Sequence, residues 1–243
     1  MNEFPIESQT SEADRQFILR ARQMLRGATQ TYRYVEVGSF LGGSLTPFIA
    51  DPACLQVLSI DEREKELPDE RGINYDYSGI TSQSMLDNLV QHGFDISKVE
   101  AFDGSVQDIG LRTELYDLAF IDGEHTDLAC FRDFAYTLPL LRSDALVMFH
   151  DSSLVHKALR IIMVYLESRA IDYRYIKGVG SEMSVILLGK YVGKNYQDAF
   201  GVRQDVEQFY AEAETRVIQS LLRNRTVVEF NMKVVPPKTK KAY

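Results

Sequence analysis

Short apolar runs alternate with helical patterns along most of the chain. In chain order, the runs are Tyr34–Val37, Val57–Ile60, a weaker Val99–Phe102, Leu118–Ile121 and Leu146–Phe149. Continuous apolar strands that alternate with helices are typical of a parallel sheet buried on both faces. The pattern therefore predicts an α/β fold with helices on both faces of a mostly parallel sheet.

A leading helix is predicted before the first strand. Ser11, followed three residues later by Asp14, resembles a capping box, and Gly27 is expected to stop the helix. The residues that share its apolar face are Phe17, Ala21, Met24 and Leu25.

Three further helices are predicted between the strands, over Ser84–Val90, Leu128–Leu141 and Leu154–Leu166. In the last, the buried stripe is expected to be Leu154, Ala158, Ile161, Ile162 and Tyr165. His92 and His156 are expected to be ordinary residues on helix surfaces.

The sheet is expected to close with an antiparallel pair, which brings it to seven strands. Tyr173–Ile176 and Ser184–Leu188 flank the turn-forming stretch Gly178–Ser181. We divide the chain into a leading helix (residues 1–30), a central domain (31–190) and a C-terminal extension (191–243).

The C-terminal extension breaks the alternation of strands and helices. Its helical spacing predicts one long amphipathic helix, carried by Val206, Tyr210, Ala213, Val217 and Leu221. Thr226–Val235 is expected to be a short strand or extended arm, and the basic end after it to be frayed. We expect the extension to cap the sheet or to form a homodimer.

Composition narrows the class of protein. Of the 243 residues, 45% are hydrophobic and 26% are charged, as in soluble globular domains. The net charge of -8 and the lack of a broad basic face argue against nucleic-acid binding, and no apolar run suggests a membrane segment. Cys54 and Cys130 fit buried thiols in a reducing compartment, and no targeting segment is visible, so we expect a cytoplasmic protein.

Candidate chemistry begins at the glycine-rich stretch Val35–Ser44, where a buried strand runs into a turn and then a helix. Glycines allow a ligand to approach the backbone, and a helix N-terminus offers free N–H groups. Asp61, at the end of the second strand, is placed to accept hydrogen bonds from ribose hydroxyls. Together these features favour nucleoside binding over a structural turn.

Acidic residues also follow the later strands: Asp103, Asp122 and Asp151. Ligands of open parallel sheets collect at the carboxyl ends of the strands, so these side chains are expected to converge on one crevice. Each Asp could instead cap the helix that follows it. Capping does not explain why His125 and His150 accompany the last two.

These strand ends resemble a class I S-adenosylmethionine-dependent methyltransferase with a Rossmann-like fold. Within that class the chain is similar to the catechol O-methyltransferase type and to bacterial small-molecule enzymes with a strand-end Asp-Gly-x-His and a later His-Asp. The likeness covers roughly Tyr34 to Leu188. It implies that Asp61 holds the ribose. It places Glu36, Gly38, Phe40 and Ser44 at the methionine end of the cofactor, and Asp103, Gly104, Ser105 and Val106 at the adenine.

The resemblance also implies a reaction centre. Asp122 would lie at the cofactor and, with Asp151, would bind Mg²⁺ or another divalent cation; Ser152 stands where metal-dependent relatives often have Asn. His125 would occupy the position of the catalytic base, filled by Lys in those enzymes. An imidazole suits that role because its ordinary pKa of about 6.5 lies near working pH.

The leading interpretation is an O-methyltransferase acting on a small hydroxylated acceptor such as a sugar, polyketide or phenol. We expect Arg63–Ile80 and the C-terminal extension to shape the acceptor pocket. One alternative is a catalytically silent cofactor-binding scaffold. It stays open because Ser152 stands where metal-dependent relatives often have Asn. A nucleotide-linked oxidoreductase is less favoured, because Gly38, Gly42 and Gly43 do not form a G-x-G-x-x-G motif.

Overall fold

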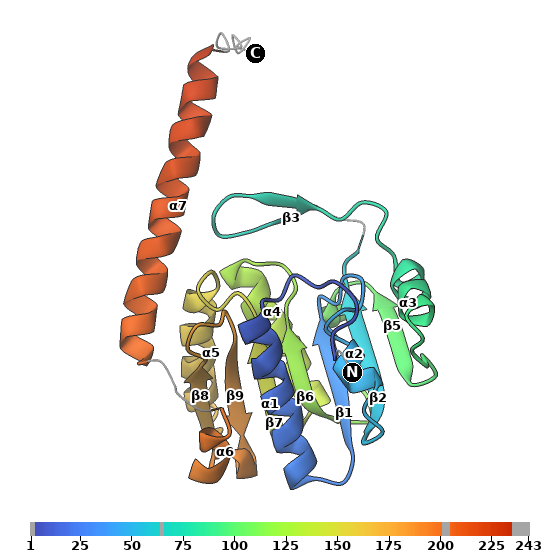
Figure 1. The fold of residues 1–243 in the computed structure, drawn as a ribbon. Coiled ribbons are helices and arrows are strands. Elements are labelled where there is room, and N and C mark those ends of the chain that lie inside the picture. The colour runs from blue at the N-terminus through green and yellow to red at the C-terminus, as the bar shows by residue number, and fades with distance from the viewer. Residues whose placement is uncertain (1–2, 64–65, 201–204, 235–243) are drawn as a thin grey trace.

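Seven strands form one central sheet in the computed structural model, which describes residues 3–63, 66–200 and 205–234 (Figure 1). The strands are β1 (Tyr32–Val37), β2 (Cys54–Asp61), β5 (Val99–Asp103), β6 (Tyr116–Ile121), β7 (Leu141–Phe149), β8 (Tyr173–Lys177) and β9 (Ser184–Leu188). Their order across the sheet is β5-β2-β1-β6-β7-β9-β8. Only β9 runs against its neighbours in this sheet, so the predicted mostly parallel fold with a closing hairpin is confirmed.

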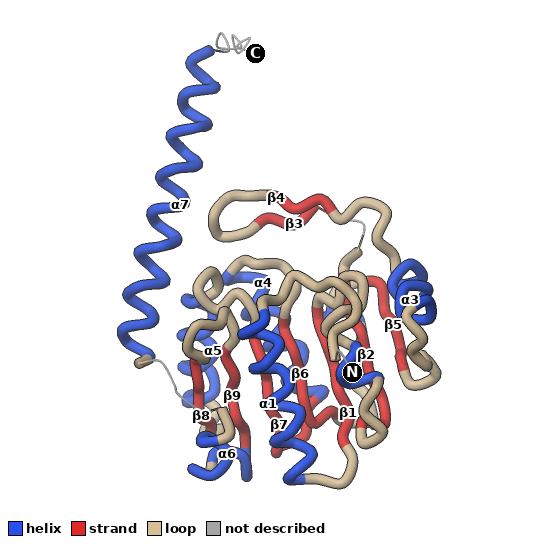
Figure 2. The backbone as a smooth tube through the Cα atoms, viewed as in Figure 1, coloured by secondary structure: helices blue, strands red, loops and turns tan. Residues whose placement is uncertain are grey.

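Helices cover both faces of the sheet (Figure 2). Alternating side chains of one strand enter different cores: Tyr34 packs with α1 (Glu12–Ala28), α2 (Thr46–Ile49) and α3 (Ser82–Gln91). Its neighbour Val35 packs with α4 (Asp127–Thr137) and α5 (His156–Ser168) on the opposite face. Burial on both faces explains why the strands read as continuous apolar runs.

The N-terminus of α1 has the predicted capping box. Ser11 accepts a hydrogen bond from the Asp14 N–H, and the Asp14 carboxylate accepts one from the Ser11 N–H at 2.9 Å. The predicted stop at Gly27 is wrong by a short margin, because Gly27 lies within the helix and the extended residue Thr29 caps it.

The details of α4 and α5 differ from the sequence pattern. α4 ends at Thr137, and a 3₁₀ turn (Leu138–Leu140) that contains Pro139 leads into β7. On α5, Ile161 is 52% exposed, and Leu159 is buried in its place. His156 is 2% exposed rather than a surface residue.

The C-terminal extension contains a short helix α6 (Lys194–Asp198) and the long helix α7 (Val206–Val234). The long amphipathic helix is confirmed, and its buried residues are Phe209, Tyr210, Ala213 and Val217. The predicted strand over Thr226–Val235 is wrong, because α7 continues through Val234; Val235 and the basic end lie outside the described residues. The second half of α7 extends beyond the sheet (Figure 1).

A two-stranded hairpin, β3 (Glu66–Pro68) with β4 (Asn74–Asp76), lies over the carboxyl ends of the central strands (Figure 2). It belongs to the segment expected to shape the acceptor pocket. The Glu70 N–H donates to the carbonyl of His125 at 3.0 Å, which holds the hairpin against the loop after β6. Two further 3₁₀ turns, Val106–Asp108 and Gly189–Val192, complete the described elements. Among the described helices, none is long and apolar enough to cross a membrane.

Candidate active site

The order of the strands reverses between β1 and β6, and this is where a ligand crevice is expected in an open parallel sheet. The backbone draws the two strand ends together, because the Asp122 N–H donates to the Val37 carbonyl at 2.8 Å. Gly38 follows Val37 with a φ of +87°, and a Cβ atom there would lie 2.1 Å from the Asp122 carbonyl oxygen. This position therefore requires glycine.

Asp61, at the end of β2, faces the glycine-rich turn. Its Oδ2 accepts a hydrogen bond from the N–H of Phe40 at 2.8 Å and lies 3.9 Å from Nε of Arg63. Phe40 is held at a φ of +45°, an unusual conformation for a residue with a side chain. Burial raises the pKa of the Asp61 carboxyl, and Arg63 opposes that shift.

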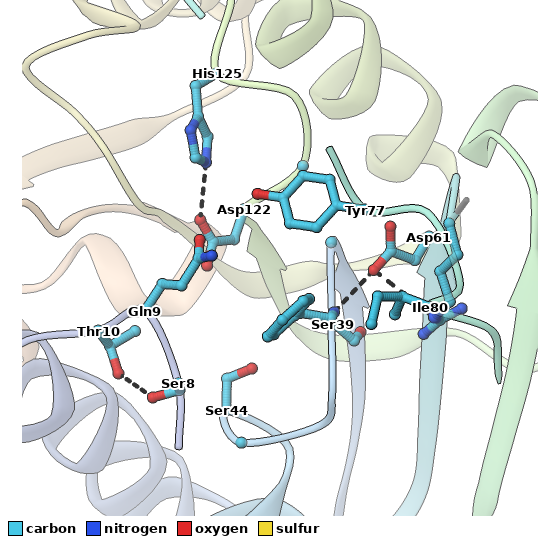
Figure 3. Close-up of a pocket in the computed structure, with 15 residues that line it drawn as sticks. Ser8, Gln9, Thr10, Ser39, Ser44, Asp61, Tyr77, Ile80, Asp122 and His125 are labelled. Atoms are coloured by element: carbon cyan, nitrogen blue, oxygen red, sulfur yellow. Dashed lines mark hydrogen bonds and ion pairs between the residues drawn. The ribbon is translucent and has the colours of Figure 1, made fainter. Parts of the chain in front are cut away.

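Two cavities meet at Gly38 and Asp61. The first is lined by the predicted residues Phe40, Ser44, Asp122 and His125. Ser39 of the glycine-rich stretch also lines it, as do Tyr77 and Ile80 from the segment expected to shape the acceptor pocket (Figure 3). The sequence did not indicate the remaining residues Ser8, Gln9 and Thr10. The second is lined by Gly104, Ser105 and Val106, the predicted adenine border, together with Asp133. The two cavities thus occupy the predicted methionine and adenine ends of one crevice.

Two predicted cofactor residues lie beside these cavities and do not line them. Glu36 is fully buried, and its carboxyl group accepts hydrogen bonds from Tyr34 and, at 2.5 Å, from Ser44. Burial raises the pKa of Glu36 to about 8. Asp103 instead binds Nη1 of Arg63 at 2.9 Å and the Ser82 hydroxyl at 2.5 Å. Both residues therefore hold side chains that line the first cavity, Ser44 in the case of Glu36 and Arg63 in the case of Asp103.

Two residues that line these cavities have buried hydroxyl groups. Ser39 lines the first cavity and Ser105 the second, and the buried Oγ of each has no hydrogen-bond partner within the described part of the chain. Buried polar groups are normally paired, by protein, water or ligand. One residue beside each end of the crevice thus has a hydroxyl group that remains unpaired.

A cluster of two carboxylates and two imidazoles lies at one end of the crevice. His125 Nε2 is 3.1 Å from Asp151 Oδ2 and 3.8 Å from Asp122 Oδ1. His150 Nδ1 is 3.0 Å from Asp122 Oδ1 and 3.2 Å from Asp151 Oδ2. The strand-end acidic residues after β6 and β7 thus converge as predicted.

The charges in this cluster stabilise one another. Burial favours the neutral form of His125, but Asp122 and Asp151 outweigh it and raise the imidazole pKa. The pKa of His150 is raised well above its ordinary value for the same reason, with help from Asp14. Burial likewise opposes ionisation of Asp151, yet His150 lowers the pKa of its carboxyl.

The donor set at this end suits a divalent cation. One ligand atom from each of Asp122, His125 and Asp151 lies within 4.8 Å of the others. Carboxylate oxygens are ligands for Mg²⁺, and an added imidazole also suits Mn²⁺ or Fe²⁺. Ser152, the third residue predicted at the cation site, is fully buried, and its hydroxyl donates to Ser184 Oγ at 2.9 Å.

Residues 35–152 match the family model described as a methyltransferase domain. That span contains the glycine-rich turn, Asp61 and the whole carboxylate–imidazole cluster. These residues form a methyltransferase domain, and the chain has the fold of the class I, S-adenosylmethionine-dependent type. The resemblance seen in the sequence is thereby confirmed, and the nucleotide-linked oxidoreductase is set aside.

Solved structures share the fold of this methyltransferase at low sequence identity. The O-methyltransferase TomG from Streptomyces achromogenes, involved in tomaymycin synthesis and solved with S-adenosylmethionine, has a TM-score of 0.50 and 18% identity, covering 77% of this chain and 83% of its own. An O-methyltransferase from Bacillus cereus in complex with S-adenosylhomocysteine has a TM-score of 0.54 and 14% identity, covering 75% and 84%. The O-methyltransferase NovP has a TM-score of 0.56 and 13% identity, covering 72% and 79%. No match was found among curated protein sequences.

An N-terminal segment that the sequence analysis did not predict lines the crevice. Phe4 and Ile6 are buried in the core, and a Cβ atom on Gly43 would lie 2.8 Å from the Glu7 carbonyl oxygen. This packing carries Ser8, Gln9 and Thr10 across the glycine-rich turn. Two apolar residues within a polar stretch were the only available signal.

Proposed function

We propose that this methyltransferase moves the methyl group of S-adenosylmethionine to a hydroxyl group of a small acceptor. The observation that carries the proposal is His125, an imidazole held between two carboxylates at the end of the cofactor crevice. The names of TomG, NovP and the Bacillus cereus protein support oxygen as the acceptor atom. When bound, the cofactor supplies a methyl group on a positively charged sulfur.

The crevice residues position the cofactor in this proposal. Asp61, anchored by the Phe40 N–H, accepts hydrogen bonds from the ribose hydroxyls. Gly104, Ser105 and Val106 border the adenine, where Ser105 has a hydroxyl to donate. At the methionine end, Gly38, Phe40 and Ser44 line the cavity, and Glu36 accepts a hydrogen bond from the Ser44 hydroxyl.

His125 removes the acceptor proton. With Nε2 held by Asp151, the Nδ1 atom is left to accept a proton as the oxygen attacks. The two carboxylates then stabilise the imidazolium, and the turn after β6 aligns it with the cofactor cavity. Positioning together with proton removal is what methyl transfer to a neutral hydroxyl requires.

We further propose that Asp122 and Asp151 hold a divalent cation. Bound there, a cation supplies positive charge that lowers the pKa of an acceptor hydroxyl and orients it. His150, hydrogen-bonded to both carboxylates and to Asp14, keeps the pair oriented.

The test is transfer of labelled methyl from S-adenosylmethionine to a panel of sugars, polyketides and phenols, with products located by mass spectrometry and NMR. The expected product carries the label on oxygen. Label on nitrogen or carbon would contradict the proposal. If the protein binds S-adenosylhomocysteine but transfers no label to any compound, the silent cofactor-binding scaffold is supported instead.

A further inference from the structure

Asp133 is a buried carboxylate that the sequence analysis did not single out. It lies on α4, where Ala129, Cys130, Phe134 and Thr137 share the buried face of the helix with it. Its side chain is only 3% exposed. A carboxylate is costly at such a position unless charged or hydrogen-bonding partners replace the lost water. Its presence on an otherwise mostly apolar face therefore indicates a function.

The two carboxylate oxygens of Asp133 have different surroundings. Oδ1 accepts a hydrogen bond from Nε of Arg132 at 2.9 Å. Among the residues that the structure describes, no donor is hydrogen-bonded to Oδ2. Buried polar groups are normally paired, by protein, water or ligand. Oδ2 can therefore accept a hydrogen bond from a ligand.

Asp133 lies at the adenine end of the crevice. It lines the second cavity together with Gly104, Ser105 and Val106, the residues that border the adenine in the proposed function. A Cβ atom on Gly123 would lie 3.1 Å from Asp133 Oδ2, and Gly123 lines both cavities. Because Gly123 has no side chain, Oδ2 is not covered from that direction.

The electrostatics of Asp133 favour a hydrogen-bond donor as its partner. Burial raises the pKa of the carboxyl to about 6, and Arg132 opposes that shift. Glu62 and Glu124, which line the same cavity, raise the pKa further. At slightly alkaline pH the group is ionised, and an ionised carboxylate only accepts hydrogen bonds. A donor facing Oδ2 is therefore stabilised, whereas a carbonyl oxygen there is repelled.

Adenine presents a donor of this kind at one edge. Its exocyclic amino group donates hydrogen bonds, and the ring nitrogen beside it accepts them. Hypoxanthine has nearly the same shape but carries a carbonyl oxygen, an acceptor, in place of the amino group. A buried carboxylate distinguishes these two bases by polarity, because the wrong base leaves a buried polar group unpaired.

We infer that Asp133 selects the adenine base of the cofactor by accepting a hydrogen bond from the exocyclic amino group on Oδ2. The inference rests on the proposed function, which places the adenine at the second cavity. Arg132 fixes the orientation of the carboxylate by holding Oδ1. Asp133 is thus a specificity-determining residue that comes from a helix and not from a strand end.

The test is calorimetric titration of the full chain, at slightly alkaline pH, with S-adenosylhomocysteine and with S-inosylhomocysteine, whose base is hypoxanthine. The ratio of the two Kd values is compared between proteins. Asp133→Asn is the informative variant, because it keeps the shape and replaces one carboxylate oxygen by an amide nitrogen that donates. Asp127→Asn is the matched control: Asp127 lies on the same helix, but its Oδ1 accepts from the Ala158 N–H at 2.8 Å and it lines neither cavity.

The wild type is expected to bind S-adenosylhomocysteine about tenfold or more tightly than S-inosylhomocysteine, the usual effect of a hydrogen bond to a charged group. Asp133→Asn should remove or reverse this preference, because Arg132 retains the amide oxygen and the amide nitrogen then faces the base. Asp127→Asn should keep the preference. If Asp133→Asn does not fold, Asp133→Ala is the second variant, and it should also lose the preference.

A merely structural role of Asp133 predicts weaker binding of both ligands at an unchanged ratio, and that result would overturn the inference. A wild type without preference, or an equal fall of the ratio in Asp127→Asn, would overturn it as well. Binding of S-adenosylhomocysteine at a ratio independent of Asp133 removes only this inference, whereas absent cofactor binding in the wild type removes the proposed function too.

Discussion

His125 Nε2 lies closer to Asp151 Oδ2, at 3.1 Å, than to Asp122 Oδ1, at 3.8 Å. Asp122 lies only three residues before His125 in the sequence, whereas Asp151 follows the end of the adjacent strand β7. The base in our account is therefore oriented by a residue that chain proximity does not reveal.

The ribose assignment predicts that Asp61→Ala weakens binding of S-adenosylhomocysteine. Loss of hydrogen bonds to a charged group costs about 1.5–3 kcal/mol, or roughly 10- to 150-fold in Kd. Asp103→Ala is the matched control, because Asp103 is the register partner of Asp61 but binds Arg63 and Ser82 instead of lining the crevice. Calorimetric titration should show the larger loss for Asp61→Ala, and equal losses would contradict the assignment.

The close approach of β1 and β6 predicts that Gly38→Ala is far more damaging than Gly72→Ala. Both glycines have positive φ, +87° and +73°, so both variants carry backbone strain of about 1–2 kcal/mol. A Cβ atom meets nothing within 4 Å at Gly72 but lies 2.1 Å from the Asp122 carbonyl at Gly38. Overpacking should cost Gly38→Ala about 1–3 kcal/mol more. Urea unfolding measures both, and equal midpoints would show that the crevice tolerates the change.

The contacts of His125 predict a raised imidazole pKa in the metal-free protein. Burial works against this shift and the carboxylates of Asp122 and Asp151 cause it, so Asp151→Asn should lower the pKa of His125. NMR titration of the His125 imidazole in EDTA-treated wild type and Asp151→Asn checks this without requiring activity. The same titration midpoint in both proteins would contradict the role of Asp151.

The proposed cation site predicts that EDTA abolishes methyl transfer and that Mg²⁺ or Mn²⁺ restores it. Asp122→Asn should lose bound metal, as measured by elemental analysis. Asp144→Asn should not, because Asp144 lies near Lys190 and lines a cavity formed by other residues. Full activity in a metal-free sample would reject the cation.

The sequence predicted the sheet well because each strand is buried on both faces and so carries an unbroken apolar run. It predicted that Asp103, Asp122 and Asp151 converge, because strand ends meet at one edge. Asp122 and Asp151 do so, whereas Asp103 instead binds Arg63 and Ser82. The docking of α1 and α7 depends on long-range packing: Asp14 reaches the β8–β9 turn, and Glu214 reaches His156. No local pattern encodes such contacts.

Helix α7 shows a second limit of local patterns. Its second half includes the run Thr226–Val228, whose β-branched residues favour strands in isolation, yet the helix continues through Val234. Propensity is a weak guide where a helix has already been nucleated. Dimerisation through this extension and a cytoplasmic location stay predictions.

The most direct measurement of the central claim compares kcat and S-adenosylhomocysteine Kd in wild type and His125→Gln, with the acceptor found in the methyl-transfer screen. We predict a fall in kcat of roughly 10²–10⁴-fold, the usual contribution of a general base, with little change in cofactor Kd. His92→Gln, at an exposed helix end, should leave both values unchanged. A near-normal kcat in folded His125→Gln would contradict the account and remove His125 from the mechanism.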